Sequence, residues 1–169
     1  MLPQTGFRWY FAYGSNMNPA RLFGERMTGH GVPHGRRLAA SLPGWRLAFN
    51  KPWSRFEGAG AANIVRDPAS ITHGTINELP DAGFEVLDRY EGVAGGHYAR
   101  EDVTVLDGEG QPCAAITYVS RYRLTEGLSP ACVYLGHLLA GRDLLPADYS
   151  EALARIPCIP DLAEMPLPP

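Results

Sequence analysis

The sequence predicts an α+β fold in which a mixed or antiparallel sheet, open or closed, packs against helices. The chain has 169 residues, 45% of them hydrophobic, so it can bury a core large enough for one domain. Strand and helix patterns alternate, and four strand candidates cluster between the first helix and the central helix. Because doubly wound folds alternate strands and helices one by one, this clustering disfavours a dinucleotide-binding fold. We expect one domain over residues 1–156 and a proline-rich tail over residues 157–169.

The N-terminal half begins with a strand and a short helix. Residues 7–13 (FRWYFAY) are rich in aromatic residues, which favour strands, and a Gly-Ser pair follows them. Asn18 and Pro19 then suit the N-terminus of a helix that runs to about Met27. Four strand candidates follow, of which the first two are alternatively one strand bent at a Pro-Gly pair: residues 36–42, 45–50, 61–66 and 72–79.

The C-terminal half begins with the central helix, which Pro80 and Asp81 open and Gly92 ends. Two more strands are expected on either side of the sequence DGEGQ, which is typical of a hairpin turn: residues 97–106 and 113–122. Two further helices complete the predicted domain, near residues 130–140 and 146–155.

Charge and cysteine content exclude or disfavour several classes of protein. The net charge of −3 comes without any basic stripe, which disfavours a nucleic-acid partner. No window has the length and apolarity of a signal or transmembrane segment, so we expect a cytoplasmic protein without a membrane partner. Cys113, Cys132 and Cys158 are odd in number and widely spaced, so we expect thiols in a reducing compartment, with neither a disulfide framework nor a zinc site. Nothing in the sequence supports a homodimer, and the oligomeric state stays open.

The first motif with chemical potential is Tyr-Gly-Ser-Asn at residues 13–16, where a strand gives way to a helix. Gly14 has no Cβ to hinder close approach, and the amides of the turn and of the first helical residues lack partners within the helix. Such amides can bind a carboxylate or a developing oxyanion. The alternative is an ordinary turn with a Ser or Asn cap.

The second motif is LDRYEGV at residues 87–93, at the end of the central helix. Glu91 lies seven residues after Phe84 and four after Leu87, so it projects from the apolar face of the helix. Burial and the negative end of the helix dipole should both raise the pKa of Glu91. A carboxyl group tuned in this way can exchange a proton near neutral pH. The alternative is a surface glutamate at a frayed helix end.

The two motifs together resemble the γ-glutamylcyclotransferase family. YFAYGSNM at residues 10–17 is followed some 75 residues later by LDRYEGVAGGHY, and this order and separation are more specific than either motif alone. The resemblance extends over residues 9–155, because FNK at 49–51, ANI within 61–64, HGTINEL at 73–79 and LPADY at 145–149 are similar to bacterial members.

The resemblance implies a small, largely antiparallel β-barrel with flanking helices and a pocket at its mouth. It also implies an enzyme that cyclises a γ-glutamyl group to 5-oxoproline and releases an amine, without metal or cofactor. The family's catalytic glutamate falls on Glu91. Its pocket tyrosine falls on Tyr134 if two residues are inserted, and on Cys132 in an ungapped alignment. The substrate-binding positions implied are Tyr10, Phe11, Ala12, Tyr13, Gly14, Ser15, Asn16 and Tyr134.

The residues themselves are compatible with this reaction. A γ-glutamyl substrate carries its own nucleophile, the α-amine, so the protein needs to fold the substrate, move one proton and stabilise one oxyanion. The sequence leaves two further functions open. One is a γ-glutamylamine cyclotransferase or deprotecting lyase, which would differ in the loops that receive the leaving amine, such as residues 51–60. The other is a non-catalytic binding domain on the same fold.

Overall fold

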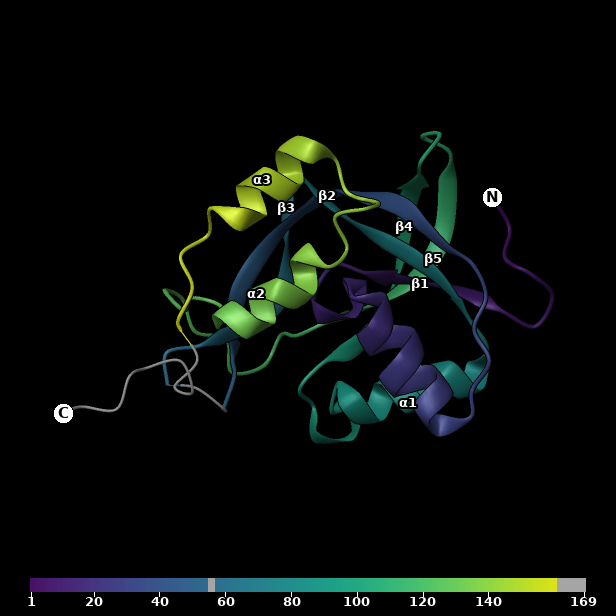
Figure 1. Cartoon of the computed structure of the whole chain (residues 1–169), viewed down its shortest axis with the longest axis horizontal. Helices are drawn as coiled ribbons and strands as arrows, with labels where there is room; N and C mark the ends of the chain where they lie inside the picture. The colour runs from purple at the N-terminus through teal and green to yellow at the C-terminus, as the bar shows by residue number, and fades with distance from the viewer. Residues whose placement is uncertain (55–56, 161–169) are drawn as a thin grey trace.

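The computed structural model describes residues 1–54 and 57–160, which form a closed β-barrel with helices packed outside it (Figure 1). The order around the barrel is β1-β3-β2-β4-β5. Neighbouring strands are antiparallel except β1 and β5, which pair in parallel and close the barrel. The predicted class, a mixed and largely antiparallel barrel with flanking helices, is confirmed. The strands are β1 (Arg8–Ala12), β2 (Arg37–Pro52), β3 (Gly60–Leu79), β4 (Ala99–Asp107) and β5 (Pro112–Val119).

Two long strands replace the four candidates expected between the first helix and the central one. β2 continues through Pro43 and Gly44, with a register shift between Pro43 and Trp45, so the alternative of one bent strand is correct. Gly44 has a φ of 80°, a conformation that favours glycine. β3 likewise joins the two candidates that were expected over residues 61–66 and 72–79.

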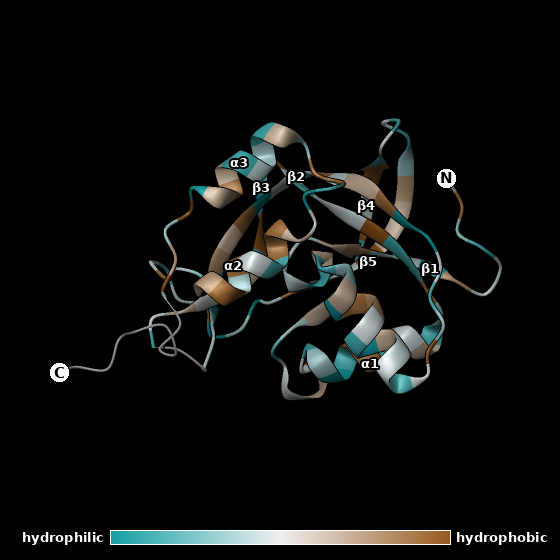
Figure 2. Ribbon diagram, in the orientation of Figure 1, coloured by the Kyte–Doolittle hydropathy of each residue, from teal (hydrophilic) through white to brown (hydrophobic). Residues whose placement is uncertain are grey.

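The expected hairpin joins β4 to β5. The side-chain oxygen Oδ1 of Asp107 accepts hydrogen bonds from the amides of Glu109 and Gln111, each at 2.9 Å, and these bonds fix the turn. Figure 2 shows the tip of this hairpin as a hydrophilic segment that projects from the barrel.

Helical segments cover two sides of the barrel. The first expected helix is present, and the Asn18 Oδ1 accepts a bond from the amide of Ala20 at 3.0 Å. Figure 1 shows η2 beside α1 on one side, and α2 with α3 along the long strands β2 and β3. Within the described residues, no helix is long and apolar enough to cross a bilayer. The helical segments are η1 (Ser15–Met17), η2 (Ala20–Met27), η3 (Thr28–His30), α1 (Asp81–Tyr90), η4 (Val93–Gly95), α2 (Cys132–Leu139) and α3 (Ala147–Ala154).

The hydrophobic core fills the barrel and the space between the barrel and α1. Trp9 and Phe11 of β1 are at most 1% exposed, as are Ile76 of β3 and Phe84 of α1. Burial of side chains of this size contributes roughly 2 kcal/mol each. Tyr10 and Ala12, on the opposite face of β1, are buried as well. β1 is therefore fixed on both faces, and its C-terminal end holds the YGSN turn in place.

The cysteines differ from the expectation. Cys132 and Cys158 form a disulfide that closes a sequence separation of 26 residues, whereas Cys113 is a free and buried thiol. The chain after α3 returns to the N-terminus of α2, where Cys132 N donates to the carbonyl oxygen of Ile159 at 2.8 Å. Wide spacing in the sequence gives no sign of this return. The first four residues of the expected tail, 157–160, are thus joined to the domain, and 161–169 lie outside the described residues.

Candidate active site

The YGSN turn follows β1 and passes close to two other elements. A Cβ on Gly14 would lie 3.1 Å from the Cβ of Ala62 in β3 and 3.4 Å from the hydroxyl oxygen of Tyr134 in α2. The φ of Gly14 is −116°, which any residue can adopt, so space and not backbone conformation is the reason for glycine here. In the described part of the chain, the amides of Gly14, Ser15 and Asn16 donate none of the recorded hydrogen bonds.

Glu91 follows α1 directly. Its amide donates to the carbonyl oxygen of Leu87 at 2.8 Å, and Gly92 then adopts the left-handed conformation that ends the helix. Phe84 and Leu87 are completely buried on the same helix face. The Glu91 side chain is 18% exposed, so the inward direction expected from the helical spacing is confirmed.

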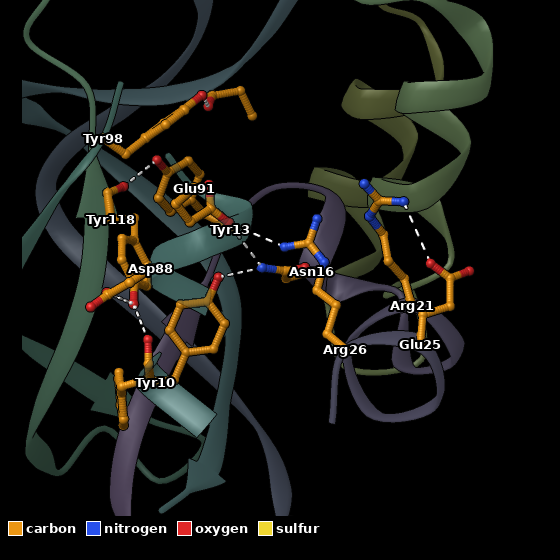
Figure 3. Close-up of polar contacts among 12 residues, drawn as sticks. Tyr10, Tyr13, Asn16, Arg21, Glu25, Arg26, Asp88, Glu91, Tyr98 and Tyr118 are labelled. Atoms are coloured by element: carbon orange, nitrogen blue, oxygen red, sulfur yellow. Dashed lines mark hydrogen bonds and ion pairs between the residues drawn. The ribbon is translucent and has the colours of Figure 1, made fainter. Parts of the chain in front are cut away.

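One oxygen of the Glu91 carboxylate receives two polar contacts (Figure 3). Oε1 accepts a hydrogen bond from Nη1 of Arg26 at 3.2 Å and one from Nδ2 of Asn16 at 3.3 Å. Burial raises the pKa of Glu91, and the charge and hydrogen bond of Arg26, the charge of Arg21 and the hydrogen bond of Asn16 lower it. Burial outweighs them, so the pKa of Glu91 lies above its usual value, in the direction expected from the sequence.

Tyrosine hydroxyls surround the carboxylate. The hydroxyl of Tyr10 accepts a hydrogen bond from Nδ2 of Asn16 at 2.8 Å, and the hydroxyl of Tyr13 donates to the carbonyl oxygen of Tyr118 at 2.5 Å. Tyr98 and Tyr134 both meet the backbone of one residue of β3. The carbonyl oxygen of that residue, Ala62, accepts from Tyr98 at 2.8 Å, and its amide donates to Tyr134 at 3.0 Å.

Burial raises the pKa of each of these four tyrosines, Tyr10, Tyr13, Tyr98 and Tyr134. They are therefore neutral phenols at physiological pH. Glu91, whose pKa is raised, thus lies among phenols that donate and accept hydrogen bonds without ionising.

These groups line one small cavity of about 30 Å³. It is formed where the end of β1, the start of β3, the end of α1 and the N-terminal turn of α2 come together. The lining residues are Tyr10, Tyr13, Gly14, Ser15, Asn16, Ala62, Glu91, Tyr98, Tyr118 and Tyr134. Of the two alternatives for the pocket tyrosine, Tyr134 is the residue in the cavity, and Cys132 is in the disulfide.

Two of the expected substrate-binding positions do not line the cavity. Phe11 is fully buried in the barrel, where its ring packs so closely over Gly74 that a Cβ there would lie 2.9 Å from it. Ala12 is 1% exposed and pairs with Thr75 of β3. Successive side chains of a strand point to opposite faces, so a run of consecutive residues cannot all face one pocket. The side chains of Phe11 and Ala12 therefore do not form part of the cavity wall.

Four residues of the site were not singled out in the sequence: Arg26, Ala62, Tyr98 and Tyr118. Tyr98 and Ala62 stand within the segments that carry the family resemblance, so those segments could have suggested them. Tyr118 lies on an expected strand and has no distinguishing signal. Arg26 is 65 residues from Glu91, and no local pattern connects the two.

Comparisons with known proteins find similar sequences. The model of the AIG2-like family matches residues 72–153, which include β4, β5, α1 and Glu91. A γ-glutamylcyclotransferase of Bos taurus is 27% identical over 161 residues, and one of Homo sapiens is 27% identical over 150 residues. Each comparison covers 87% of this chain and 77% of the relative.

The fold is also found in solved structures. A structure described as a gamma-glutamyl cyclotransferase superposes with a TM-score of 0.77 at 24% identity, over 90% of this chain and 89% of that one. Sequence relatives, family model and fold thus lead to one conclusion. The chain is similar in sequence to γ-glutamylcyclotransferases and to the AIG2-like family, and it has their fold.

Proposed function

We propose that this protein is a γ-glutamylcyclotransferase. It would convert a γ-glutamyl amino acid or peptide to 5-oxoproline and release the amine. The observation that carries the proposal is Glu91, a shielded carboxyl group with a raised pKa, in one cavity with the turn at Gly14. The names of the curated relatives support the same reaction class.

The reaction needs no atom from outside the substrate. The α-amine of the γ-glutamyl group attacks the γ-carbonyl carbon and forms the nitrogen–carbon bond of a five-membered lactam. The Glu91 carboxylate takes the proton that the amine loses. It then returns this proton to the leaving nitrogen as the original amide bond breaks, so Glu91 ends as a carboxylate. The raised pKa of Glu91 suits both halves of the cycle.

The turn and the phenols supply the stabilisation of charge. Negative charge develops on the γ-carbonyl oxygen during the attack, and amides of residues 14–16 would bind this oxygen or the substrate carboxylate. The hydroxyls of Tyr10 and Tyr134 accept hydrogen bonds from Asn16 and from the Ala62 amide. Each of these hydroxyls keeps a proton that it can donate to substrate. The polar lining lies in a largely buried site, where such bonds are stronger than in water.

No metal is required in this scheme. Within residues 1–54 and 57–160, no three side chains of His, Cys, Asp or Glu come together in a way that could hold a metal ion. A cofactor has no role in a proton transfer coupled to an intramolecular attack.

The test is a Glu91→Gln variant assayed with a panel of γ-glutamyl amino acids, peptides and amines. The amide keeps the shape of the side chain and cannot act as a base, so we expect 5-oxoproline release to fall by about a hundredfold or more. Release is quantified by mass spectrometry. Glu85→Gln, at an exposed position of the same helix, is the matched control and should keep full activity.

Each outcome has a defined meaning. Wild-type turnover by Glu91→Gln would remove Glu91 from its catalytic role. If the wild-type protein turned over only the γ-glutamylamines of the panel, these would replace γ-glutamyl amino acids and peptides as the proposed substrate class. Binding without turnover across the whole panel would leave a binding domain on the same fold and would contradict the proposal.

A further inference from the structure

The two oxygens of the Glu91 carboxylate have different surroundings. Oε1 accepts the hydrogen bonds from Arg26 and Asn16, at 3.2 and 3.3 Å. Among the described residues, Oε2 takes part in no recorded hydrogen bond or ion pair. Since Glu91 lines the cavity, the carboxylate offers a substrate one occupied oxygen and one available oxygen. An asymmetric attachment of this kind fixes which oxygen meets the substrate.

Arg26 is itself held in place. Its side chain is only 6% exposed, and its guanidinium carbon lies 4.5 Å above the ring of Tyr90, the last residue of α1. It comes from η2, which Figure 1 shows beside α1, and its contact with Glu91 therefore joins the two helices. Glu91 is its ionic partner among the described residues. A buried guanidinium stacked on a ring and bonded to a carboxylate has little freedom to turn away.

Arg26 also supplies a positive charge beside the buried negative charge of the Glu91 carboxylate, and few other groups of the site balance that charge. The groups that face Glu91 are Arg21 from η2, Asn16 from η1, Tyr10 and Tyr13 at the end of β1, Tyr98 before β4 and Tyr134 from α2. The tyrosines are neutral, and Arg21 acts on Glu91 through its charge without a hydrogen bond. Without Arg26, burial would favour the protonated carboxyl group, which cannot act as a base.

We infer that Arg26 is a positioning residue of the reaction: with Asn16 it anchors Oε1 of Glu91, so that Oε2 is the oxygen that receives the proton of the substrate amine. This inference rests on the proposed function for the identity of the substrate. The anchoring itself is a property of the free protein and can be measured without substrate.

The kinetic test compares Arg26→Gln, Arg26→Lys and the wild type across pH. Loss of the guanidinium should lower kcat about tenfold or more at pH 7, with a smaller change in KM, because the base is less ionised and less well oriented. The acid limb of the kcat/KM profile should move to higher pH by about one unit. Arg26→Lys keeps the charge and should bring this limb back toward the wild type. Arg155→Gln, at an exposed site just after α3, is the control.

A purely structural role for Arg26 predicts something else. Arg26→Gln would then lose stability, measured by urea unfolding, while its folded fraction kept the wild-type pH profile. That result, or an acid limb that Arg26→Lys moves as far as Arg26→Gln does, would overturn the inference.

A second measurement uses the wild-type protein alone. The carboxyl carbon of Glu91 and the guanidinium nitrogens of Arg26 are followed by nuclear magnetic resonance as pH is changed. We expect the Arg26 resonances to shift with the same midpoint as Glu91, since the two groups share a hydrogen bond. Unrelated midpoints would overturn the anchoring. If the enzyme panel finds no turnover but the midpoints coincide, the proposed function fails and the anchoring of Glu91 stands.

Discussion

At the scale of single residues, the end of α1 holds two carboxylates about one turn apart, Asp88 and Glu91. Their surroundings shift their pKa values in opposite directions. Burial raises the pKa of Asp88, but two hydrogen bonds of 2.8 Å from Arg100 and one of 2.7 Å from Tyr118 outweigh it, so the pKa of Asp88 is lowered. Glu91 has longer and fewer bonds, and burial prevails. Asp88 is therefore a fixed anion that orients Tyr118, and Glu91 is the group suited to exchange a proton.

Gly14→Ala tests whether the turn must lie close to β3 and α2. The new Cβ would lie 3.1 Å from the Cβ of Ala62 and 3.4 Å from the hydroxyl of Tyr134. We expect kcat/KM to fall about tenfold or more, and the free energy of unfolding to fall by about 1–3 kcal/mol because the new methyl group is overpacked. Gly24→Ala on η2, where nothing lies within 4 Å, is the control. Wild-type kinetics in Gly14→Ala would show that this close approach has no role.

The candidate site could be predicted from the sequence only where local patterns carry it. Helical spacing put Glu91 on the buried face of α1, and the glycine in the turn indicated close approach. Arg26 and Tyr118 reach Glu91 and Tyr13 through the closure of the barrel and the pairing of two distant helices. No periodicity within either segment records those contacts.

At the scale of elements, β3 shows why strand boundaries were harder to predict than strands. Its residues 67–70, a sequence of Asp-Pro-Ala-Ser, are typical of a turn, and Asp67 does bond to the amide of Ala69 and the hydroxyl of Ser70. Yet β3 is paired with β2 on both sides of this segment. Arg66 lies opposite Trp45 before it, and Ile71 lies opposite Pro43 directly after it. The turn-like segment is thus an irregularity inside one strand, because the partner strand bends at the same level.

Removal of the disulfide should destabilise the protein without changing the barrel. The bond ties the N-terminus of α2 to Cys158 across 26 residues, and a closed loop of that length contributes about 3.5 kcal/mol in the chain-entropy model. We expect Cys158→Ser to lower the free energy of urea unfolding by about this amount. Cys132→Ser and the double variant should show the same loss and no more, since each removes the same bond. Wild-type protein with an unchanged unfolding curve in reductant would contradict the prediction.

At the scale of the whole molecule, the cavity exists because the barrel closes. The single parallel pairing of Tyr10 in β1 with Ile116 in β5 brings the first and last strands together. Tyr13, just after β1, then reaches the carbonyl oxygen of Tyr118. Phe84 of α1 contacts both strands, since its ring packs against Tyr10 and its carbonyl oxygen accepts a hydrogen bond from Tyr118. The fold class followed from the order of strands and helices. The closure depends on contacts more than 100 residues apart, so the order of elements left an open or a closed sheet possible and the family resemblance implied the barrel.

A second long-range cluster governs how the whole protein responds to acid. The Glu78 side chain in β3 is completely buried. It accepts bonds from the amide and side chain of Gln4, at 2.9 and 3.0 Å, and from the amide and guanidinium of Arg36. It therefore fastens both the N-terminal segment and the approach to β2 onto β3.

These bonds make stability depend on pH in a definite direction. Burial raises the pKa of Glu78, but the hydrogen bonds from Arg36 and Gln4 outweigh it and lower this pKa to about 2, from an ordinary value of 4.5. As pH falls, Glu78 therefore becomes protonated at a lower pH in the folded state than in the unfolded state. The stabilisation, roughly 3 kcal/mol, is complete above about pH 5 and is lost between about pH 4.5 and 2. Glu78→Gln should lack it, and urea unfolding from pH 7 to pH 2 should show the two proteins converging in acid. The exposed Glu85→Gln should follow the wild type throughout, and a constant difference between Glu78→Gln and wild type at every pH would contradict this account.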